Sequence, residues 1–329
     1  MSLSAKVGSV LPGMTIAFTV GLAASFLSEH YGAPAMLFAL LLGMSLNFLY
    51  EDPRSASGIE FSARDVLRWG VALLGFRIVL QDLLGLGWHT LFLVVLGVFS
   101  TLALGVLLAR IVGLRKRFGV LTGGAVGICG ASAALAISAV LPPDPERERD
   151  TVFVVVGVTT LSTLAMIFYP LLTASLGLSD TVAGIFIGAT IHDVAQVVGA
   201  GYSVSDTAGD VATLTKLMRV ALLLPIVLVC SLVFRGARVA GEARPPLLPN
   251  FLVAFVVCIV VNSFVSIPDT VLDSINSLSR HCLVAAIAAI GLKTNLRNML
   301  QIGSRAVILL VMETLWLAGF ALLGLRFVI

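Results

Sequence analysis

The sequence predicts an all-α polytopic membrane protein, and its composition is the first reason. Hydrophobic residues make up 58% of the 329 residues and charged residues only 12%, against roughly 45–50% and about 25% in soluble domains. The mean hydropathy is +1.06. A soluble domain of this size could not bury so much apolar surface, because folded surface still grows with mass. The composition therefore excludes an ordinary soluble enzyme, a disordered chain, a disulfide scaffold and a nucleic-acid-binding domain.

The second reason is a series of eleven apolar stretches, each near the ~20 residues that a spanning helix needs. Helices are expected because every backbone group in lipid must be hydrogen-bonded internally. The linkers are short, so residues 1–329 are expected to form one integral membrane domain. The expected spans are 10–28, 34–50, 66–86, 89–110, 119–141, 151–176, 181–201, 211–234, 249–267, 280–299 and 305–327.

The basic residues predict the orientation of the chain. Under the eleven-span count, the Arg- and Lys-rich loops and Lys6 all fall on one side, which is the cytoplasmic side by the positive-inside rule. The loop Pro142–Asp150 falls on the opposite side and balances its arginines with acidic residues. We therefore expect a bacterial inner-membrane protein with a retained first helix, a cytoplasmic N-terminus and a periplasmic C-terminus.

The sequence also repeats itself at an offset of 216 residues. ALLGFRIVLQDLLGLG at 72–87 matches AAIGLKTNLRNMLQIG at 288–303, and Arg77 corresponds to Lys293. Asn47 and Asn262 lie about 30 residues upstream of the two copies. The two matching spans are seven apart and so run in opposite directions, which indicates an inverted-topology repeat. The alternative is chance similarity between leucine-rich helices.

We take the outer repeat elements to be 34–110 and 249–327. In them, Asn47 and Asn262 are expected to support broken backbone, and Arg77 and Lys293 to add positive charge. Two glycine-rich core segments, 119–141 and 181–234, lie between the repeat elements.

The first glycine-rich segment predicts a helix interrupted in mid-membrane. Gly123, Gly124, Gly127 and Gly130 lie within eight residues, and each costs about 1 kcal/mol in a helix interior. A new half-helix is expected to begin near Ala131–Ser132, where free N–H groups and a positive dipole end would attract an anion. The candidate binding residues are Gly124, Cys129, Gly130 and Ser132. The alternative is a small-residue packing face.

The second segment places His192, Asp193 and Gln196 inside an otherwise apolar span. Ionisable groups in lipid are costly, so a functional site is the default interpretation; a polar clasp between helices is the alternative. His192 and Gln196 would share a face if the helix were continuous. The span count gives both glycine-rich segments the same direction, which fits an inverted pair only if one of them is re-entrant.

Four basic residues lie deep in expected spans, and few acids oppose them. Lys216 and Arg219 are three residues apart, so they share a helix face, and with Arg77 and Lys293 they predict an electropositive cavity opposed only by Asp193 and Glu313. Arginine can bind an oxyanion through its planar donor fork. The alternative pairs each base with an acid or a helix C-terminus.

No enzyme motif competes with these features. The sequence contains no HExxH, Walker or GxSxG motif, and its four cysteines have no CxxC spacing, so we expect buried thiols rather than metal ligands. No cofactor and no metal are expected.

The motifs LRWGVALLGFRIVLQDLLGLG, GGAVGICGASAA, GATIHDVAQVVGAG, TKLMRVALLLP and AAIAAIGLKTNLRNML resemble the YeiH-type family of bacterial inner-membrane proteins, which carry a sulfate-exporter label. The resemblance runs from about residue 10 to the C-terminus and is most specific at 127–134 and 188–201. It implies kinship with cation/proton antiporters and bile-acid/sodium symporters, with a panel domain, a core domain with two interrupted crossing helices, and elevator-like movement. The Thr or Ser that the family leads us to expect near Ala125–Val126 is missing.

The sequence thus predicts a secondary transporter that exports a small oxyanion such as sulfate, sulfite or an organic sulfonate, coupled to protons or another ion. Lys216 and Arg219 would neutralise the anion, and His192 or Asp193 would carry the coupling proton. The alternatives are a cation/proton antiporter that uses Asp193 and a non-transporting intramembrane protein. The expected partners are the anionic solute, the coupling ion and lipid, with a homo-oligomer left open.

Overall fold

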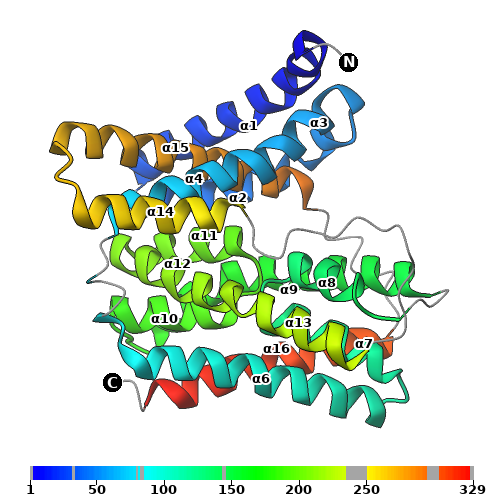
Figure 1. Cartoon of the computed structure of the whole chain (residues 1–329). Helices are drawn as coiled ribbons and strands as arrows, with labels where there is room; N and C mark the ends of the chain where they lie inside the picture. The colour runs from blue at the N-terminus through cyan, green and yellow to red at the C-terminus, as the bar shows by residue number, and fades with distance from the viewer. Residues whose placement is uncertain are drawn as a thin grey trace. The chain divides into compact units, whose positions relative to one another are not determined.

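The computed structural model describes residues 3–31, 34–78, 81, 85–142, 146–234, 250–294 and 304–326. Throughout these ranges the regular structure is helical (Figure 1). The chain divides into two compact units. Unit 1 comprises Met1–Gly85, Val198–Asp210 and Asn250–Asn295, and unit 2 comprises Leu86–Val197, Val211–Pro249 and Leu296–Ile329.

The described helices have the lengths and compositions of a membrane protein, which confirms the predicted fold class. Six are long and apolar enough to cross a bilayer, and four more are apolar but shorter. The long ones are Ser9–Tyr31, Gly87–Ile111, Arg149–Ser175, Asp206–Val233, Asp269–Lys293 and Arg305–Leu325; the short ones are Ala35–Ser45, Asp180–Thr190, Val194–Val204 and Val253–Phe264.

Unit 1 is held together by close helix crossings at glycines. The Cα atoms of Gly43 and Gly291 allow α2 and α15 to touch, because a Cβ atom on either glycine would lie 2.9 Å from the other's Cα. Gly13 and Gly58 do the same for α1 and α3. The helices of this unit are α1 (Leu3–Tyr31), α2 (Ala35–Ser45), α3 (Pro53–Phe61), α4 (Leu67–Leu74), α14 (Asn250–Phe264) and α15 (Asp269–Lys293).

The 216-residue repeat is visible in unit 1. The helix of the first copy ends in a 3₁₀ turn at Arg77 and the helix of the second copy ends at Lys293. The next residues, Ile78 and Thr294, are both extended. The expected spans 66–86 and 280–299 are therefore interrupted at equivalent positions. The counterparts Asp82 and Asn298 lie outside the described residues.

Two asparagine side chains cross-link the two copies reciprocally. Asn47 Nδ2 donates to the Leu292 carbonyl at 2.6 Å, and Asn262 Nδ2 donates to the Ile78 carbonyl at 3.2 Å. Each amide thus binds the carbonyl end of the interrupted helix in the other copy, where the last helical carbonyls lack intrahelical partners. This geometry agrees with the expected support of broken backbone by Asn47 and Asn262.

Unit 2 contains two helix–break–helix segments surrounded by longer helices. Gly105 and Gly119 allow α6 and α7 to cross closely, since a Cβ on either would lie within 2.7 Å of the other's carbonyl oxygen. The helices that lie wholly in this unit are α6 (Gly87–Ile111), α7 (Lys116–Gly127), α8 (Ala131–Ser138), α9 (Arg147–Ser175), α10 (Asp180–Thr190), α13 (Leu223–Val233) and α16 (Ser304–Leu325). The unit boundaries fall inside α11 (Val194–Val204) and α12 (Asp206–Ala221).

The first segment, α7–α8, turns back on itself. Its helices of 12 and 8 residues rise only about 18 and 12 Å, too short for the ~30 Å hydrocarbon core. Arg115, which precedes α7, pairs with Glu146 and Asp150 at the start of α9 at 2.6 and 2.7 Å. Near the end of α8, the Ser138 hydroxyl lies 2.6 Å from that of Thr151. The end of α8 therefore lies beside the beginning of α7.

This hairpin corrects two sequence expectations. Residues 119–141 do not form a span, and residues 146–150 lie beside Arg115 before α7 rather than on the opposite side. The segment contains enough apolar residues in total for one span, so its composition alone predicts a crossing. The pairing of Arg115 with residues more than 30 positions away, together with the contact between Ser138 and Thr151, shows that the chain returns.

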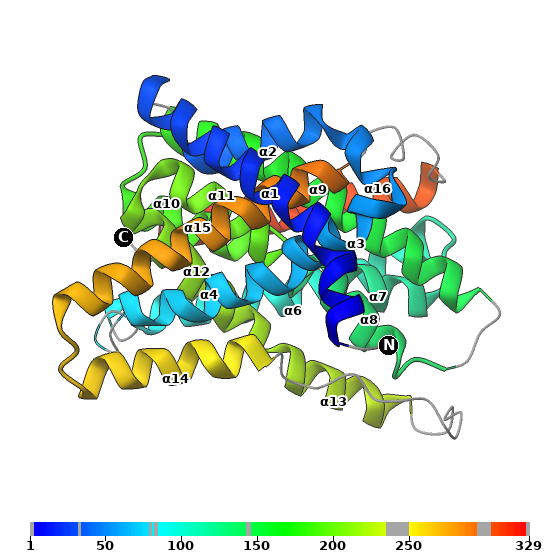
Figure 2. The ribbon, with the colours of Figure 1, turned by 90° about the horizontal axis from the view of Figure 1, so that it is seen from above.

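Side-chain contacts also fix the direction of the second segment, α10–α11. Arg115 meets Asp150 and Phe118 meets Phe153, so α7 and α9 run the same way. Tyr169 of α9 packs on Phe186 of α10, and the Ser162 hydroxyl accepts from the Asp193 N–H, so α9 and α10 are antiparallel. It follows that α7 and α10 run in opposite directions. Figures 1 and 2 show α7 and α8 together toward one end of unit 2 and α10 toward the other end.

The chain reverses within α10–α11 as well. Gly188 of α10 packs on Ala212 of α12, and the Ile191 carbonyl accepts from Arg219, so α10 and α12 run in the same direction. The expected equal direction of the two glycine-rich segments is therefore wrong. It came from counting 119–141 as a crossing. With two hairpins, the segments form an inverted pair.

The hairpin at α7–α8 can be tested by cysteine accessibility. In a background lacking the four native cysteines, we expect Arg110→Cys and Arg149→Cys to react with a membrane-impermeant maleimide from the same side. Leu176→Cys, at the far end of α9 and 50% exposed, is the control and should react from the other side. Labelling of positions 110 and 149 from opposite sides would restore the eleven-span count.

Candidate functional site

The candidate site is the place in unit 2 where the two helix breaks meet. The first break runs from Ile128 to Gly130, between α7 and α8, and Gly130 has a φ of +63°, a conformation that glycine adopts without strain. The second break runs from Ile191 to Asp193. A Cβ on Gly130 would lie 3.6 Å from the His192 backbone, so the breaks are in direct contact. The predicted interruptions, including a half-helix that begins at Ala131, are confirmed.

Lys216 lies behind both breaks and is completely buried. Its ammonium Nζ donates to the carbonyl oxygens of Ile128, Ile191 and His192 at 2.7, 2.9 and 2.5 Å. An ammonium group has three donors, so all of them are used. In each break, Lys216 therefore supplies a donor to backbone carbonyls that lack the usual helical hydrogen bond.

Arg219 lies one turn further along α12 and is 1% exposed. Its Nε donates to Gly127 at 2.9 Å, its Nη1 donates to Gly188 and Ile191 at 3.3 and 3.1 Å, and its Nη2 donates to Val126 and Gly127 at 2.8 and 2.6 Å. These five bonds match the five N–H donors of a guanidinium group. The carbonyl ends of α7 and α10 therefore converge on this one side chain.

The two cations thus interact with helix C-termini, which was the alternative interpretation of their sequence pattern. A helix C-terminus carries about half a negative charge, which a cation stabilises. The expectation that Lys216 and Arg219 contact an anion directly meets a physical obstacle in this conformation, because their donors are bonded to backbone carbonyls. They still contribute two positive charges immediately behind the breaks.

His192 lies in the break itself and is fully buried. Its Nε2 is 3.0 Å from the Thr314 hydroxyl, and that hydroxyl donates to the Leu310 carbonyl at 2.8 Å. Because the hydroxyl has one proton, Nε2 is assigned as the donor and Nδ1 as the acceptor. Among the described residues, Nδ1 has no hydrogen-bond partner.

Asp193 and Gln196 begin the second half-helix. The Asp193 carboxylate accepts from the Ala195 N–H at 2.9 Å, which is the geometry of an N-cap. The Gln196 amide bonds to Ser162 and Thr163 of α9 at 3.3 and 3.4 Å. The condition for a shared face between His192 and Gln196, a continuous helix, is therefore not met.

The predicted binding residues differ in accessibility. Gly124, Cys129 and Gly130 are buried, Asp193 is half-buried and Ser132 is exposed. The first turn of α8 has N–H groups without intrahelical acceptors, and the Ser132 hydroxyl lies beside them. Ser132, two residues past the first break, and Asp193, in the second break, are thus the predicted binding residues that are not buried.

Sequence reasoning missed the hydroxyl groups that line the breaks. Thr122 of α7, Ser162 and Thr163 of α9, and Thr314 of α16 are all buried and all bond to groups at or near the breaks. Their signal was present as a cluster, Thr159–Thr163, of hydroxyl residues in one apolar span. Such residues bond across helices in membranes.

Arg77 and Lys293 belong to unit 1, and both pair with acids. Arg77 lies 2.9 Å from Asp210 and 3.2 Å from Asp206, and Lys293 pairs with Glu60. These pairs satisfy the alternative interpretation of the basic residues. Of the four basic residues expected to make a cavity electropositive, only Lys216 and Arg219 have no ion pair with an acid among the described residues.

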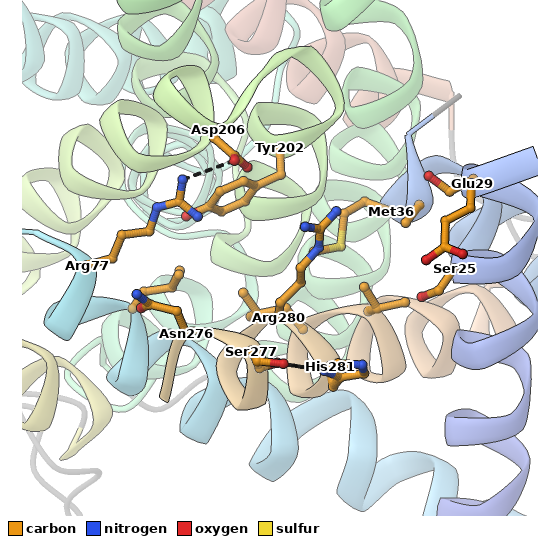
Figure 3. A pocket seen from close by; sticks show the side chains of 15 residues that line it. Ser25, Glu29, Met36, Arg77, Tyr202, Asp206, Asn276, Ser277, Arg280 and His281 are labelled. Atoms are coloured by element: carbon orange, nitrogen blue, oxygen red, sulfur yellow. Dashed lines mark hydrogen bonds and ion pairs between the residues drawn. The ribbon is translucent and has the colours of Figure 1, made fainter. Parts of the chain in front are cut away.

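Unit 1 also contains a cavity of about 390 Å³. Figure 3 shows Arg77 and Arg280 beside it, together with Glu29 and Asp206. Two bases and two acids balance, so this cavity offers no net charge that would select an anion. The breaks in unit 2 are the stronger candidate. Within the described part of the chain, no cluster of His, Cys, Asp and Glu could hold a metal ion.

Comparison with known proteins gives consistent results over nearly the whole chain. The family described as "Conserved hypothetical protein 698" matches residues 12–310. A UPF0324 membrane protein of Chlorobaculum tepidum is 51% identical over 94% of this chain and 88% of its own length. One of Rhizobium meliloti is 50% identical over 99% and 95% of the two chains. The UPF0324 membrane protein TauZ of Paracoccus denitrificans is 50% identical over 97% and 95%.

Among solved structures, the sodium proton antiporter MjNhaP1 of Methanocaldococcus jannaschii aligns over 96% of this chain and 99% of its own. The sequence identity is 12% and the TM-score is 0.30. A score this low does not establish a shared arrangement of helices.

The buried cations lead to a stability prediction. Lys216→Met leaves two backbone carbonyls without these donors and Arg219→Met leaves three, because the Ile191 carbonyl is bonded to both side chains. One buried bond to a charged group is worth about 1.5–3 kcal/mol. We expect each variant to lose at least about 3 kcal/mol of unfolding free energy, measured by denaturant titration in detergent. The control Lys293→Met removes a partly exposed pair and should lose about 1 kcal/mol or less. Equal losses in all three would contradict the assigned role.

Proposed function

We propose that this chain, which belongs to the UPF0324 family of membrane proteins described as "Conserved hypothetical protein 698", is a secondary transporter. We propose further that it exports a small oxyanion, such as sulfate, sulfite or an organic sulfonate, by ion-coupled alternating access. The family assignment agrees with the resemblance to YeiH-type proteins. Membership establishes a membrane protein, and the transport activity is our inference from the site.

The observation that carries the proposal is the pair of inverted hairpins whose breaks touch. Neither hairpin crosses the hydrocarbon core, and each enters unit 2 from the end opposite to the other. Displacement of one hairpin would therefore expose the breaks from one side only. Broken helices of this kind form substrate sites in secondary transporters. Irregular backbone at membrane depth is tolerated where it is buried in protein or lines a water-filled cavity.

The charges around the breaks favour an anion. Lys216 and Arg219 contribute two positive charges, and Asp193 is the one carboxylate among the described residues of the two breaks. The first turn of α8 adds the positive end of a helix dipole beside Ser132. A solute bound at Ser132 would thus be attracted by groups that also hold the protein together, without displacing their carbonyl partners.

Two alternatives remain specific enough to test. Asp193 is a half-buried carboxylate at a helix break, which is the feature a cation/proton antiporter would need. A non-transporting intramembrane protein would need no access to the breaks. The exposure of Ser132 favours transport over this second alternative.

We also propose the orientation expected from the basic loops, with a cytoplasmic N-terminus and a periplasmic C-terminus in the bacterial inner membrane. Replacing two of the eleven expected spans by hairpins removes two crossings, so the number stays odd. The loop with Arg147 and Arg149 joins the other basic loops, as the positive-inside rule favours. Lipid, the solute and a coupling ion are the proposed partners.

The transport proposal is tested by flux of radiolabelled sulfate and sulfite into proteoliposomes. We expect uptake by the wild-type protein, and a loss of about tenfold in kcat/KM for Ser132→Ala, the size of one charged hydrogen bond. His192→Ala should also lower the flux. The matched control is Ser175→Ala, an exposed serine at the end of α9, which should leave flux unchanged. Wild-type flux with unaltered Ser132 and His192 variants would show that the site is wrong.

Asp193→Asn separates the anion transporter from the cation antiporter. If the protein carries an anion, removing this negative charge should preserve or increase sulfite binding, measured as ligand-induced thermal stabilisation. If it is a cation/proton antiporter, the same variant should abolish sodium-driven proton movement, and sulfite should not stabilise the wild type. The second result would replace the anion proposal.

A further inference from the structure

Glu313 is a buried carboxyl group that the proposed anion site does not use. It lies in α16 within a candidate membrane span and is 0% exposed. Its Oε1 atom lies 2.8 Å from the Thr122 hydroxyl of α7. Its Oε2 atom is buried and has no hydrogen-bond partner among the described residues.

The packing around Glu313 is shaped to admit the carboxyl group. A Cβ atom on Gly105 of α6 would lie 2.4 Å from Oε1, so any larger residue would displace the acid. Gly105 in turn crosses Gly119 of α7. The absence of a side chain at Gly105 therefore leaves the space that the Glu313 carboxyl group occupies.

The groups facing Glu313 do not neutralise a charged carboxylate. The helices packed against α16 are α6, α7, α9 and α10, and among the described residues none of them forms an ion pair with Glu313. Their charged residues lie in their end turns: Arg110 on α6, Lys116 and Arg117 on α7, Arg147, Arg149 and Asp150 on α9, and Asp180 on α10. The other titratable groups of the described residues on these helices are His89 on α6 and Tyr169 on α9, and α16 itself carries Arg305 in its first turn. A fully buried, unpaired carboxylate costs several kcal/mol, so the group is protonated in this conformation.

Glu313 is also connected to both hairpins. Thr122, its partner, lies five residues before the end of α7. The next residue of α16, Thr314, bonds to His192 in the other break. A change of charge at Glu313 would therefore directly alter its bond to Thr122 in the first hairpin. It would also occur next to the bond between Thr314 and His192 of the second hairpin.

We propose that Glu313 is the proton-binding residue of the transport cycle and that the coupling ion is the proton, an inference that rests on the proposed transport function. When the hairpins open to water, the carboxylic acid releases its proton to water and becomes a carboxylate. When they close, the carboxylate takes one proton from water and is buried as the neutral acid. The Thr122 hydroxyl can bond to both forms, because it can donate or accept.

The test uses Glu313→Gln, which keeps the size of the neutral acid and a donor for Thr122 but cannot titrate. In proteoliposomes we expect this variant to retain exchange of sulfite across the membrane without a gradient. It should lose the increase in sulfite flux that a pH gradient causes in the wild type. We expect that increase to be roughly 5–150-fold, the range of typical coupling free energies. The control Glu60→Gln removes a carboxylate that is 42% exposed and should keep the full pH effect. An unchanged pH effect in Glu313→Gln would overturn the inference.

A second measurement does not depend on the solute. Infrared difference spectra of the wild type between acid and alkaline buffer should contain a carboxylic acid carbonyl band that is absent in Glu313→Gln. Thr122→Val should move the midpoint of that band by about 0.5–1 pH unit, the equivalent of one net hydrogen bond. If the wild type carries no oxyanion but shows this band, the transport proposal fails and the proton site stands. If no band depends on Glu313, the proton site fails whatever the flux.

Discussion

The structure depends on two buried cations that bind the carbonyl ends of two broken helices. Interrupting a helix at membrane depth leaves backbone carbonyls without partners, and each costs several kcal/mol in a medium without water. Lys216 and Arg219 lie one helical turn apart on α12, and their eight N–H···O contacts connect that helix to both hairpins. The hydrogen bonds between the two cations and the carbonyls offset both the cost of burying the charges and the cost of leaving the carbonyls without helical partners. Neither the buried charges nor the broken helices would therefore be stable alone.

Unit 1 meets the same requirement with neutral groups. Its two repeated helices end at Arg77 and Lys293, and the amides of Asn47 and Asn262 bind the carbonyls at the ends. Neutral amides suffice because each donates to one carbonyl, whereas Lys216 and Arg219 each donate to several carbonyls. The difference gives unit 2 a concentration of positive charge that unit 1 lacks, since Arg77 and Lys293 pair with carboxylates.

This arrangement separates the groups that hold the site from those that could act in it. The cations are fully engaged and buried, so they provide charge and rigidity. Ser132 and Asp193 lie at or next to the breaks and are not buried, and His192 and Glu313 each retain one buried atom that has no hydrogen-bond partner among the described residues. A solute and a proton could therefore bind at different places, and both places contact the hairpins whose movement would link them.

The sequence by itself determined the helical membrane class, the repeat and the positions of the breaks, because apolar length, glycine content and charge are local properties. It did not determine that α8 turns back, because a half-helix of eight small or apolar residues has the same composition whichever way it runs. It also left open what Lys216 and Arg219 bind, since a cation near a break can neutralise a solute or a helix end. Their partners lie 24 to 93 residues away, and only the tertiary structure brings those carbonyls within hydrogen-bonding distance.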